Sequence, residues 1–158
     1  MNVAIWLLLT AVLVNGLLVG ASMDQSIKQL PARHRIGVVA YSEYSKAADL
    51  RNGVVFYGAL GIGGALIAIA AAVVGIINQS GGQVTTALWV VIVLTLAHSA
   101  VTSRAAPTNF KQRNAGEDEE RLTAVFGSFV KLQTIRVSLQ FLTLLALIWG
   151  LAAQIAHT

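Results

Sequence analysis

Cysteine is absent from the 158 residues, and charged residues are scarce. Without cysteine the chain has no disulfides, no thiolate ligands for zinc or iron–sulfur clusters, and no cysteine nucleophile. Charged residues make up 11% of the chain and hydrophobic residues 56%, whereas an average soluble domain is about 25% charged. The mean hydropathy is +0.70. This composition disfavours a soluble globule and favours an integral membrane protein.

Charge is missing altogether from three long stretches. The eleven Lys and Arg and the seven Asp and Glu all fall within residues 24–51 and 104–136. The charge-free stretches at 1–23 and 137–158 each fit one membrane-spanning helix of about 20 residues, and the stretch at 52–103 fits two with a turn between them. We therefore predict an all-α fold, with four transmembrane helices bundled in a single integral membrane domain. The spans are expected at about 3–23, 53–77, 84–103 and 133–156 of the domain 1–158.

Four features define the segments around these spans. The first span is expected to be retained rather than cleaved as a signal peptide, because residues 1–23 contain no Lys or Arg and form a longer apolar run. The uncharged polar cluster from Asn78 to Gln83, with two adjacent glycines, predicts a tight turn. Four consecutive acids at 117–120 favour a helix N-terminus. The first connection contains an amphipathic or interfacial segment at 41–52, expected on the cytoplasmic side.

The charge distribution also predicts orientation. All eleven Lys and Arg lie in the first and third connections, and the second has none. The positive-inside rule then puts those two connections in the cytoplasm, and both termini and the 78–83 turn outside a plasma or inner membrane. Trp6, Trp89 and Trp149 fall toward the predicted outer half, as interfacial aromatic residues do. The net charge of +4 is expected to contact anionic membrane lipid rather than nucleic acid, because the basic residues are mixed with seven acids beside hydrophobic spans.

Small residues are concentrated in the first two spans. Gly16 and Gly20 form a GxxxG pair. The second span holds further glycines and alanines: Gly58, Gly61, Gly63, Gly64, Gly75, Ala70, Ala71 and Ala72. Small residues let helix backbones approach closely, so the first interpretation is helix packing inside the bundle. An oligomer interface, or room for a flat hydrophobic ligand, is the alternative.

Polar residues inside the spans indicate an internal pocket. In the third span Thr95, His98 and Thr102 recur at i, i+3 and i+7 and share one helix face. The fourth helix carries a similar stripe: Gln133, Arg136, Gln140 and Thr143. Tyr57 and Asn15 lie at a comparable depth in the other two spans, at a rise of about 1.5 Å per residue. Because an unpaired polar group in hydrocarbon is costly, we expect these groups to face a pocket that opens toward the cytoplasm and binds a hydrophobic small molecule.

His98 has two interpretations. In the first, a threonine hydroxyl or a backbone carbonyl satisfies the imidazole, and the residue is structural. In the second it acts as an acid, a base or a ligand, because histidine titrates near neutrality. The candidate catalytic residues are His98, Tyr57 and Arg136. No metal or cofactor is expected, since no HExxH or Glu-x-x-His motif occurs, no two histidines lie at ligand spacing, and no carboxylate lies within a span.

Arg136 opens the predicted fourth span, where an unpaired guanidinium is costly. We expect it to reach the lipid head groups or to pair with an acid of the first connection, Asp49 in preference to Glu43 or Asp24. Asp49 and Arg51 lie just before the second span, either as a charge network at the helix ends or as an anchor for the polar part of a lipophilic substrate. The candidate substrate-binding residues are Asn15, Asp49, Arg51, Thr95 and Gln140.

Several short motifs carry a family resemblance. They are the pair Gly16 and Gly20, the basic stretch Pro31–Arg35, the segment Ala48–Gly53, and Arg136 ahead of the last span. With the four-span plan, the chain resembles the anthrone-oxygenase-like family of small bacterial and fungal membrane proteins over nearly its whole length. Its named members oxidise polycyclic anthrones to quinones without an evident metal or flavin. The resemblance implies a pocket for a hydrophobic small molecule and a cofactor-independent, oxygenase-like reaction.

Three functional hypotheses fit these features. The first is an enzyme-like protein that binds an aromatic or isoprenoid-like molecule between the helices and uses His98, assisted by Tyr57, Gln140 and Arg136, for proton transfer. The second is a non-catalytic accessory subunit that packs its glycine-rich second span against a larger membrane complex. The third is a small transporter that works as a dimer, which the absence of a carboxylate from every span disfavours. The expected partners are membrane lipid, a hydrophobic ligand, and a homo-oligomer or larger membrane complex.

Overall fold

The computed structural model describes residues 3–78 and 81–156. The α-helices within them are α1 (Val3–Asp24), α2 (Leu30–Ile36), α3 (Val38–Ala47), α4 (Val54–Ile77), α5 (Gly82–Phe110) and α6 (Glu119–Ala156). Two π-helical segments, η1 (Gln25–Gln29) and η2 (Ala48–Gly53), and a 3-10 segment, η3 (Lys111–Asn114), continue these helices. The described residues contain no strand, so the predicted all-α class is confirmed.

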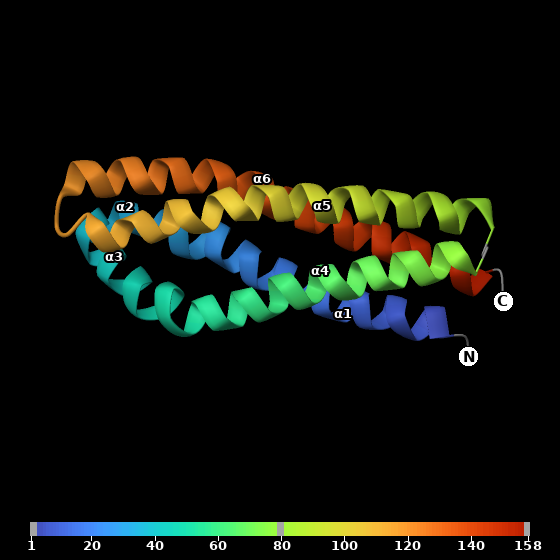
Figure 1. Cartoon of the computed structure of the whole chain (residues 1–158). Helices are drawn as coiled ribbons and strands as arrows, with labels where there is room; N and C mark the ends of the chain where they lie inside the picture. The colour runs from blue at the N-terminus through green and yellow to red at the C-terminus, as the bar shows by residue number, and fades with distance from the viewer. Residues whose placement is uncertain (1–2, 79–80, 157–158) are drawn as a thin grey trace.

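The long helices α1, α4, α5 and α6 lie alongside one another in alternating directions (Figure 1). α1 begins and α6 ends at one end of the bundle, and α2 and α3 lie at the other end. Each of the four helical rods contains an 18-residue window that is apolar and long enough to cross a membrane. The predicted bundle of four apolar helices is confirmed, and the chain is a multi-pass membrane protein.

The predicted turn between the second and third spans falls close to its expected position. α4 ends at Ile77, the predicted boundary, and α5 begins at Gly82, two residues before the predicted one. Asn78 is in a turn, and Gly81 has φ +90°, a backbone conformation that glycine adopts without strain. Residues 79 and 80 of the predicted turn lie outside the described residues.

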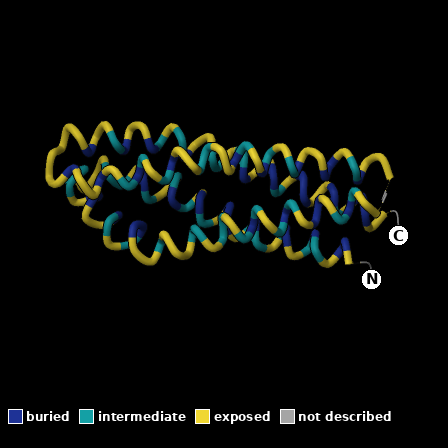
Figure 2. Tube along the Cα trace, viewed as in Figure 1, coloured by how far each residue is buried: buried dark blue, intermediate teal, exposed yellow. Residues whose placement is uncertain are grey.

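Apolar side chains cover the outside of the bundle. Leu13, Leu17, Ile62, Leu66 and Val93 are between 63% and 69% exposed, and exposed positions follow the outer side of every long helix (Figure 2). A monomeric soluble protein rarely exposes so much contiguous apolar surface. Lipid tails are as apolar as these side chains, so a bilayer covers this surface at no hydrophobic cost.

Small residues hold the helices together on the inside. The core of the apolar half includes four fully buried alanines: Ala11, Ala68, Ala71 and Ala72. An added Cβ on Gly75 would collide with the side chain of Leu88, and one on Gly64 would touch Val14 and Asn15. Close backbone approach of this kind is the main way in which membrane helices gain packing energy. The predicted role of small residues in packing is therefore confirmed at these positions.

The same interpretation is wrong for the other glycines of the first two spans. No atom beyond the local helix lies within 4 Å of a Cβ built on Gly16, Gly20, Gly58, Gly61 or Gly63. These glycines do not bring helices of this chain together. The two alternatives stay open for these glycines: a contact with another protein molecule, or room for a ligand.

The charged connections are helical rather than loops. α1 continues through η1 and α2 to Ile36, and the chain reverses at Gly37, whose φ of +87° favours glycine. The 38 residues of α6 are about 57 Å long, whereas a hydrocarbon core is about 30 Å thick. The helices therefore continue well beyond a membrane at the end that carries α2 and α3.

This charged end has a hydrophobic core of its own. It contains Leu30, Tyr41, Leu122, Phe126 and Phe129, each at most 3% exposed. The ring of Tyr41 contacts that of Phe126 edge to face, with the centroids 5.0 Å apart. The predicted interfacial segment at 41–52 is thus packed through its buried face against the protein. Its predicted cytoplasmic location stays a prediction.

A buried polar network joins α3 to the end of α5. The Ser42 hydroxyl donates to Gln112 Oε1 over 3.2 Å, and Gln112 Nε2 donates to Ser45 Oγ over 3.2 Å and to Asn109 Oδ1 over 2.8 Å. Ser45 in turn donates to Asp49 Oδ2 over 2.8 Å. Gln112 is fully buried. The network therefore fixes where the carboxylate of Asp49 lies.

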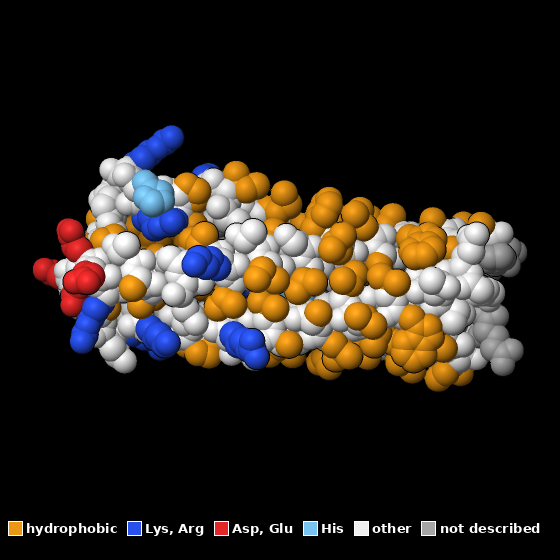
Figure 3. Space-filling view, turned by 90° about the horizontal axis from the view of Figure 1, so that it is seen from above, with side chains coloured by type: hydrophobic (Ala, Val, Ile, Leu, Met, Phe, Trp, Pro, Cys, Tyr) orange, Lys and Arg blue, Asp and Glu red, His pale blue; other side chains and the backbone are white. Residues whose placement is uncertain are grey.

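Charged side chains gather at the α2–α3 end of the bundle, and apolar side chains cover the rest of the visible surface (Figure 3). The ion pairs found among the described residues are all between neighbours on one helix or turn: Lys28–Asp24, Lys46–Glu43 and Arg121–Asp118. The predicted segregation of charge to one end of the molecule is confirmed. Which side of the membrane this end occupies stays a prediction.

Candidate ligand-binding site

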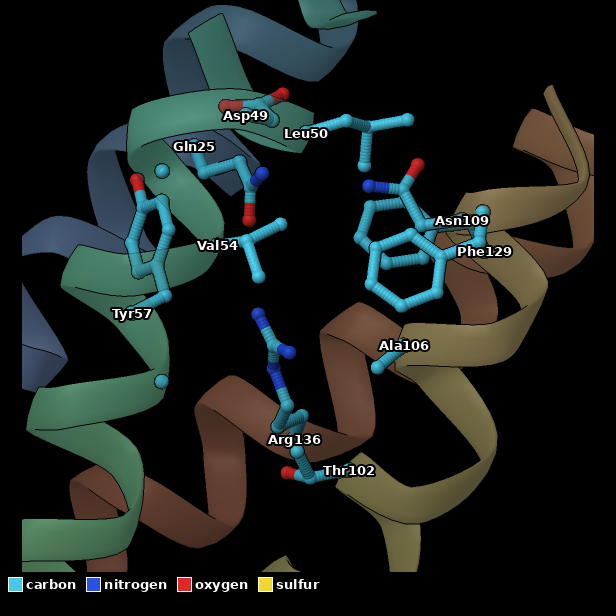
Figure 4. A pocket seen from close by; sticks show the side chains of 13 residues that line it. Gln25, Asp49, Leu50, Val54, Tyr57, Thr102, Ala106, Asn109, Phe129 and Arg136 are labelled. Carbon is cyan, nitrogen blue, oxygen red and sulfur yellow. The ribbon is translucent and has the colours of Figure 1, made fainter. Parts of the chain in front are cut away.

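A polar cavity of about 190 Å³ lies between the charged and apolar halves of the bundle. Figure 4 shows side chains from several helices pointing toward it. Its lining comprises Gln25, Asp49, Leu50, Gly53, Val54, Tyr57, Gly58, Thr102, Ala106, Asn109, Phe110, Phe129 and Arg136. Three predicted site residues, Asp49, Tyr57 and Arg136, are thus brought together. We call this space the polar cavity.

The two π-helical segments help to form the polar cavity. Gln25 begins η1, and Asp49, Leu50 and Gly53 belong to η2. A π turn holds an extra residue, which changes the direction of the side chains around it, and such turns are frequent at functional sites. An uninterrupted α-helix through 48–53 would present a different set of side chains to this space.

Arg136 lacks an ionic partner in the polar cavity. No carboxylate of the described residues lies within 4.0 Å of its guanidinium, and its buried Nε has no hydrogen-bond partner among them. The predicted pairing of Arg136 with Asp49 is therefore wrong. The other two candidates, Asp24 and Glu43, pair with lysines on their own helices. The guanidinium instead points into the cavity (Figure 4).

Asp49 is held at the opposite side of the polar cavity. It is 8% exposed, and it accepts a hydrogen bond from the Ser45 hydroxyl over 2.8 Å. Asp49 lies outside the charge-free spans, and burial raises the pKa of its carboxyl group, while the polar side chains of Ser45 and Gln25 act in the opposite direction. Gln25 Oε1 is buried without a partner among the described residues. The cavity thus contains both an unused donor on Arg136 and an unused acceptor on Gln25.

An apolar groove of about 490 Å³ adjoins the polar cavity. It runs between α4 and α5, and its lining comprises Tyr57, Gly58, Gly61, Ile62, Ala65, Leu66, Ile69, His98, Ser99, Thr102 and Ser103. Three of these residues, Tyr57, Gly58 and Thr102, also line the polar cavity. The two spaces are therefore neighbours that share a wall. We call this second space the α4–α5 groove.

His98 lines the α4–α5 groove and is held from one side. Gln140 Nε2 lies 2.9 Å and the Thr102 hydroxyl 3.1 Å from His98 Nε2. The predicted proximity of His98 to Gln140 is confirmed. Which group donates depends on which ring nitrogen carries the proton: a neutral ring protonated at Nδ1 accepts at Nε2 through its one lone pair. This geometry agrees with a structural histidine at Nε2 and leaves Nδ1 without a partner among the described residues.

Other predicted site residues lie elsewhere. Asn15 donates to the carbonyl of Ala11 over 2.9 Å and to that of Gly64 over 3.4 Å, where α1 meets α4. Thr95 is buried but lines neither space, and Arg51 is exposed on the outside of η2. None of these three residues lines either space, because similar depth in the membrane does not fix the direction in which a side chain points, and their substrate-binding role stays a prediction.

Gln25, Asn109 and Phe129 also line the cavity and are not among the predicted site residues. Asn109 follows Thr102 by seven residues and thus continues the polar face of α5, so the spacing contains a signal for it. Gln25 and Phe129 lie outside the predicted spans and carry no such signal. Among the described residues no three His, Asp or Glu side chains gather as a metal site requires.

Comparisons with protein-family models, with curated proteins and with solved structures gave no match to this chain. The class of protein is therefore defined by its fold and site alone. It is a multi-pass, four-helix membrane protein with a polar cavity at the junction of its charged and apolar halves.

Proposed function

We propose that this protein binds a hydrophobic small molecule inside its bundle. The apolar part of the molecule lies in the α4–α5 groove and its polar end in the polar cavity. The observation that carries this proposal is the shared wall of Tyr57, Gly58 and Thr102 between an apolar groove and a cavity with an unpaired arginine. Binding sites of this type combine mostly apolar walls with a few polar groups that fix orientation.

The glycines of α4 supply the room for such a molecule. Gly58 and Gly61 line the groove, and nothing lies within 4 Å of a Cβ built on either. Larger side chains at these positions would extend into the groove. Gly58 and Gly61 thus gain a role that helix packing does not give them.

The proposal includes an orientation. The polar cavity lies toward the charged end, which we place in the cytoplasm of a plasma or inner membrane on the positive-inside rule. Both termini then lie outside. A ligand dissolved in the inner leaflet reaches the groove sideways, because Ile62 and Leu66 on the groove are 67% and 64% exposed.

The reaction to test first is a cofactor-independent, oxygenase-like oxidation, which the resemblance to anthrone-oxygenase-like proteins implies. His98, Tyr57 and Arg136 line the two spaces and are the candidate catalytic residues. When His98 Nδ1 carries the ring proton, it is a donor for a ligand carbonyl or hydroxyl in the groove. A fall in turnover in a folded His98→Ala variant, with no fall in the exposed His34→Ala control, supports catalysis.

The binding proposal is tested by extracting the protein. We expect mass spectrometry of wild type purified in a neutral detergent to detect one retained hydrophobic compound. Gly61→Leu, which fills the groove, should lose it. Gly63→Leu is the matched control, because Gly63 also has nothing within 4 Å but lines neither space. Equal retention by all three proteins would contradict the proposal.

The second candidate function is an accessory subunit of a larger membrane complex. The observation in its favour is the pair Gly16 and Gly20 on α1, because no atom beyond the local helix lies within 4 Å of a Cβ built on either. Small-residue pairs at this spacing are a common contact between membrane helices. Stable co-purification of a second membrane protein, lost in Gly16→Leu, supports this candidate over the first.

A further inference from the structure

We infer that the bound molecule is a single-chain acidic amphiphile, with an anionic oxygen head on Arg136 and an apolar tail in the α4–α5 groove. This inference rests on the proposed binding function and specifies its ligand. The shared chemistry of the head is that of a carboxylate or a phosphate monoester. Both present at least two oxygens to a guanidinium.

The unpaired charge of Arg136 indicates an anionic ligand. A cation at the edge of an apolar span is costly unless an anion or several acceptors compensate it. None of the described carboxylates lies within 4.0 Å of Arg136, and its Nε has no acceptor. An anionic head in the cavity supplies the missing partner.

The surroundings of Arg136 select the kind of head. A guanidinium offers a planar fork of N–H donors that fits carboxylate and phosphate oxygens in pairs. Asn109 and Tyr57, with an amide and a phenol, line the same cavity. Figure 4 shows the Gln25 amide and the Arg136 guanidinium both pointing into the cavity, with Val54 between them in this view. A head between them accepts from Arg136, and a protonated phosphate oxygen or a bound water donates to Gln25 Oε1.

Asp49 does not take the place of this anion. Its carboxylate accepts a hydrogen bond from Ser45, and the network through Gln112 fixes Ser45 in turn. The carboxylate therefore stays on its own side of the cavity. Its negative charge weakens the binding of an anionic head, so removing that charge has the opposite effect to removing Arg136.

The α4–α5 groove defines the tail. Ile62, Ala65, Leu66 and Ile69 line it, and Gly61 leaves its floor without a side chain. Ile62 and Leu66 face outward as well, so the groove opens to the surrounding lipid. One apolar chain enters from the bilayer while its head reaches the cavity past Tyr57 and Thr102.

The test compares two ligands that differ only in the head. Radiolabelled palmitic acid and hexadecanol are bound to the full chain in phosphatidylcholine nanodiscs at pH 8, and hexadecyl phosphate serves as a competitor. We expect wild type to bind palmitate about tenfold more tightly than the alcohol, because a hydrogen bond to a charged group strengthens binding by about this factor. We also expect hexadecyl phosphate to displace palmitate.

The variants separate charge from packing. Arg136→Gln should bind the acid and the alcohol equally, whereas Lys131→Gln, which removes an exposed positive charge from the same helix, should leave the preference unchanged. Asp49→Asn should bind palmitate more tightly than wild type does. An Arg136→Gln protein that keeps the preference, or a weaker acid complex in Asp49→Asn, would overturn the inference.

The failures of the two proposals are distinguishable. If wild type binds acid and alcohol equally and Gly61→Leu weakens both, the acidic head is refuted and the binding function stands. If neither compound binds, or Gly61→Leu and Gly63→Leu bind as wild type does, both proposals fail. Displacement of palmitate by two-chain phosphatidylglycerol at the same mole fraction would refute the single-chain ligand in favour of a membrane phospholipid.

Discussion

Replacing Gln112 with leucine should loosen the charged end of the bundle without unfolding the apolar half. Gln112 is fully buried and takes part in three hydrogen bonds, with Ser42, Ser45 and Asn109. Leucine has a similar size, so packing is largely kept while all three hydrogen bonds are lost. At about 1 kcal/mol each, the loss is about 3 kcal/mol.

Hydrogen exchange measures this loss where it occurs. Each 1.4 kcal/mol is a factor of about ten in an opening equilibrium, so amides of α3 and η2 should exchange about 100-fold faster in Gln112→Leu. Amides of the apolar half of α5 should be unchanged. Gln83→Leu, at an exposed position of the same helix, is the matched control and should have no effect on α3. Unchanged exchange of α3 in Gln112→Leu would refute the structural role given to the network.

Three further predictions concern topology, pH and the histidine. Cysteines introduced at Gln83 and Glu120, both exposed, should be labelled by an impermeant thiol reagent on intact cells at Gln83 alone; labelling at Glu120 alone would invert the orientation. Burial raises the pKa of Asp49 above its ordinary 3.8, so the folded protein binds this proton more tightly than the unfolded chain does. The proton therefore stabilises the fold below pH 3.8, and this stabilisation is lost as the pH rises through the raised pKa. The thermal midpoint should therefore fall less steeply above about pH 4 in Asp49→Asn than in wild type, and equal slopes would contradict the assignment. A double-mutant cycle of the free energy of unfolding with His98→Phe and Gln140→Leu should give a coupling energy of about 0.5–1.5 kcal/mol. Simple additivity of the two single variants would contradict a hydrogen bond between these side chains.

The four apolar helices were predictable because a charge inside hydrocarbon is costly, so each charge-free stretch predicts an apolar helix. The end of α4 at Ile77 was predicted to the residue, whereas α5 runs on to Phe110 and α6 begins at Glu119, beyond the predicted spans. The charged connections carry no comparable signal. Their helices are stabilised by contacts such as that between Tyr41 and Phe126, 85 positions apart in the chain, which local sequence does not reveal.

The candidate site was predictable in depth and only partly in direction. Residue spacing places Thr102 and His98 on one face of α5, and both line the groove. Spacing does not say which neighbour a face meets, so Asn15 was assigned to a pocket although it binds backbone between α1 and α4. The π turn at η2 also changes which side chains point inward, and Arg51 is exposed there.

The central claim, that the α4–α5 groove and the polar cavity hold one apolar molecule, is tested most directly by mapping where such a molecule lies. A neutral long-chain probe with a diazirine near its polar end is photolysed with the protein in nanodiscs, and the labelled residues are identified by mass spectrometry. The account predicts labels on the lining of the two spaces, around Tyr57 to Gly61 on α4 and His98 to Ala106 on α5, that disappear in Gly61→Leu and persist in Gly63→Leu. Labels spread evenly over the lipid-facing residues of all four helices, and equal in both variants, would contradict it.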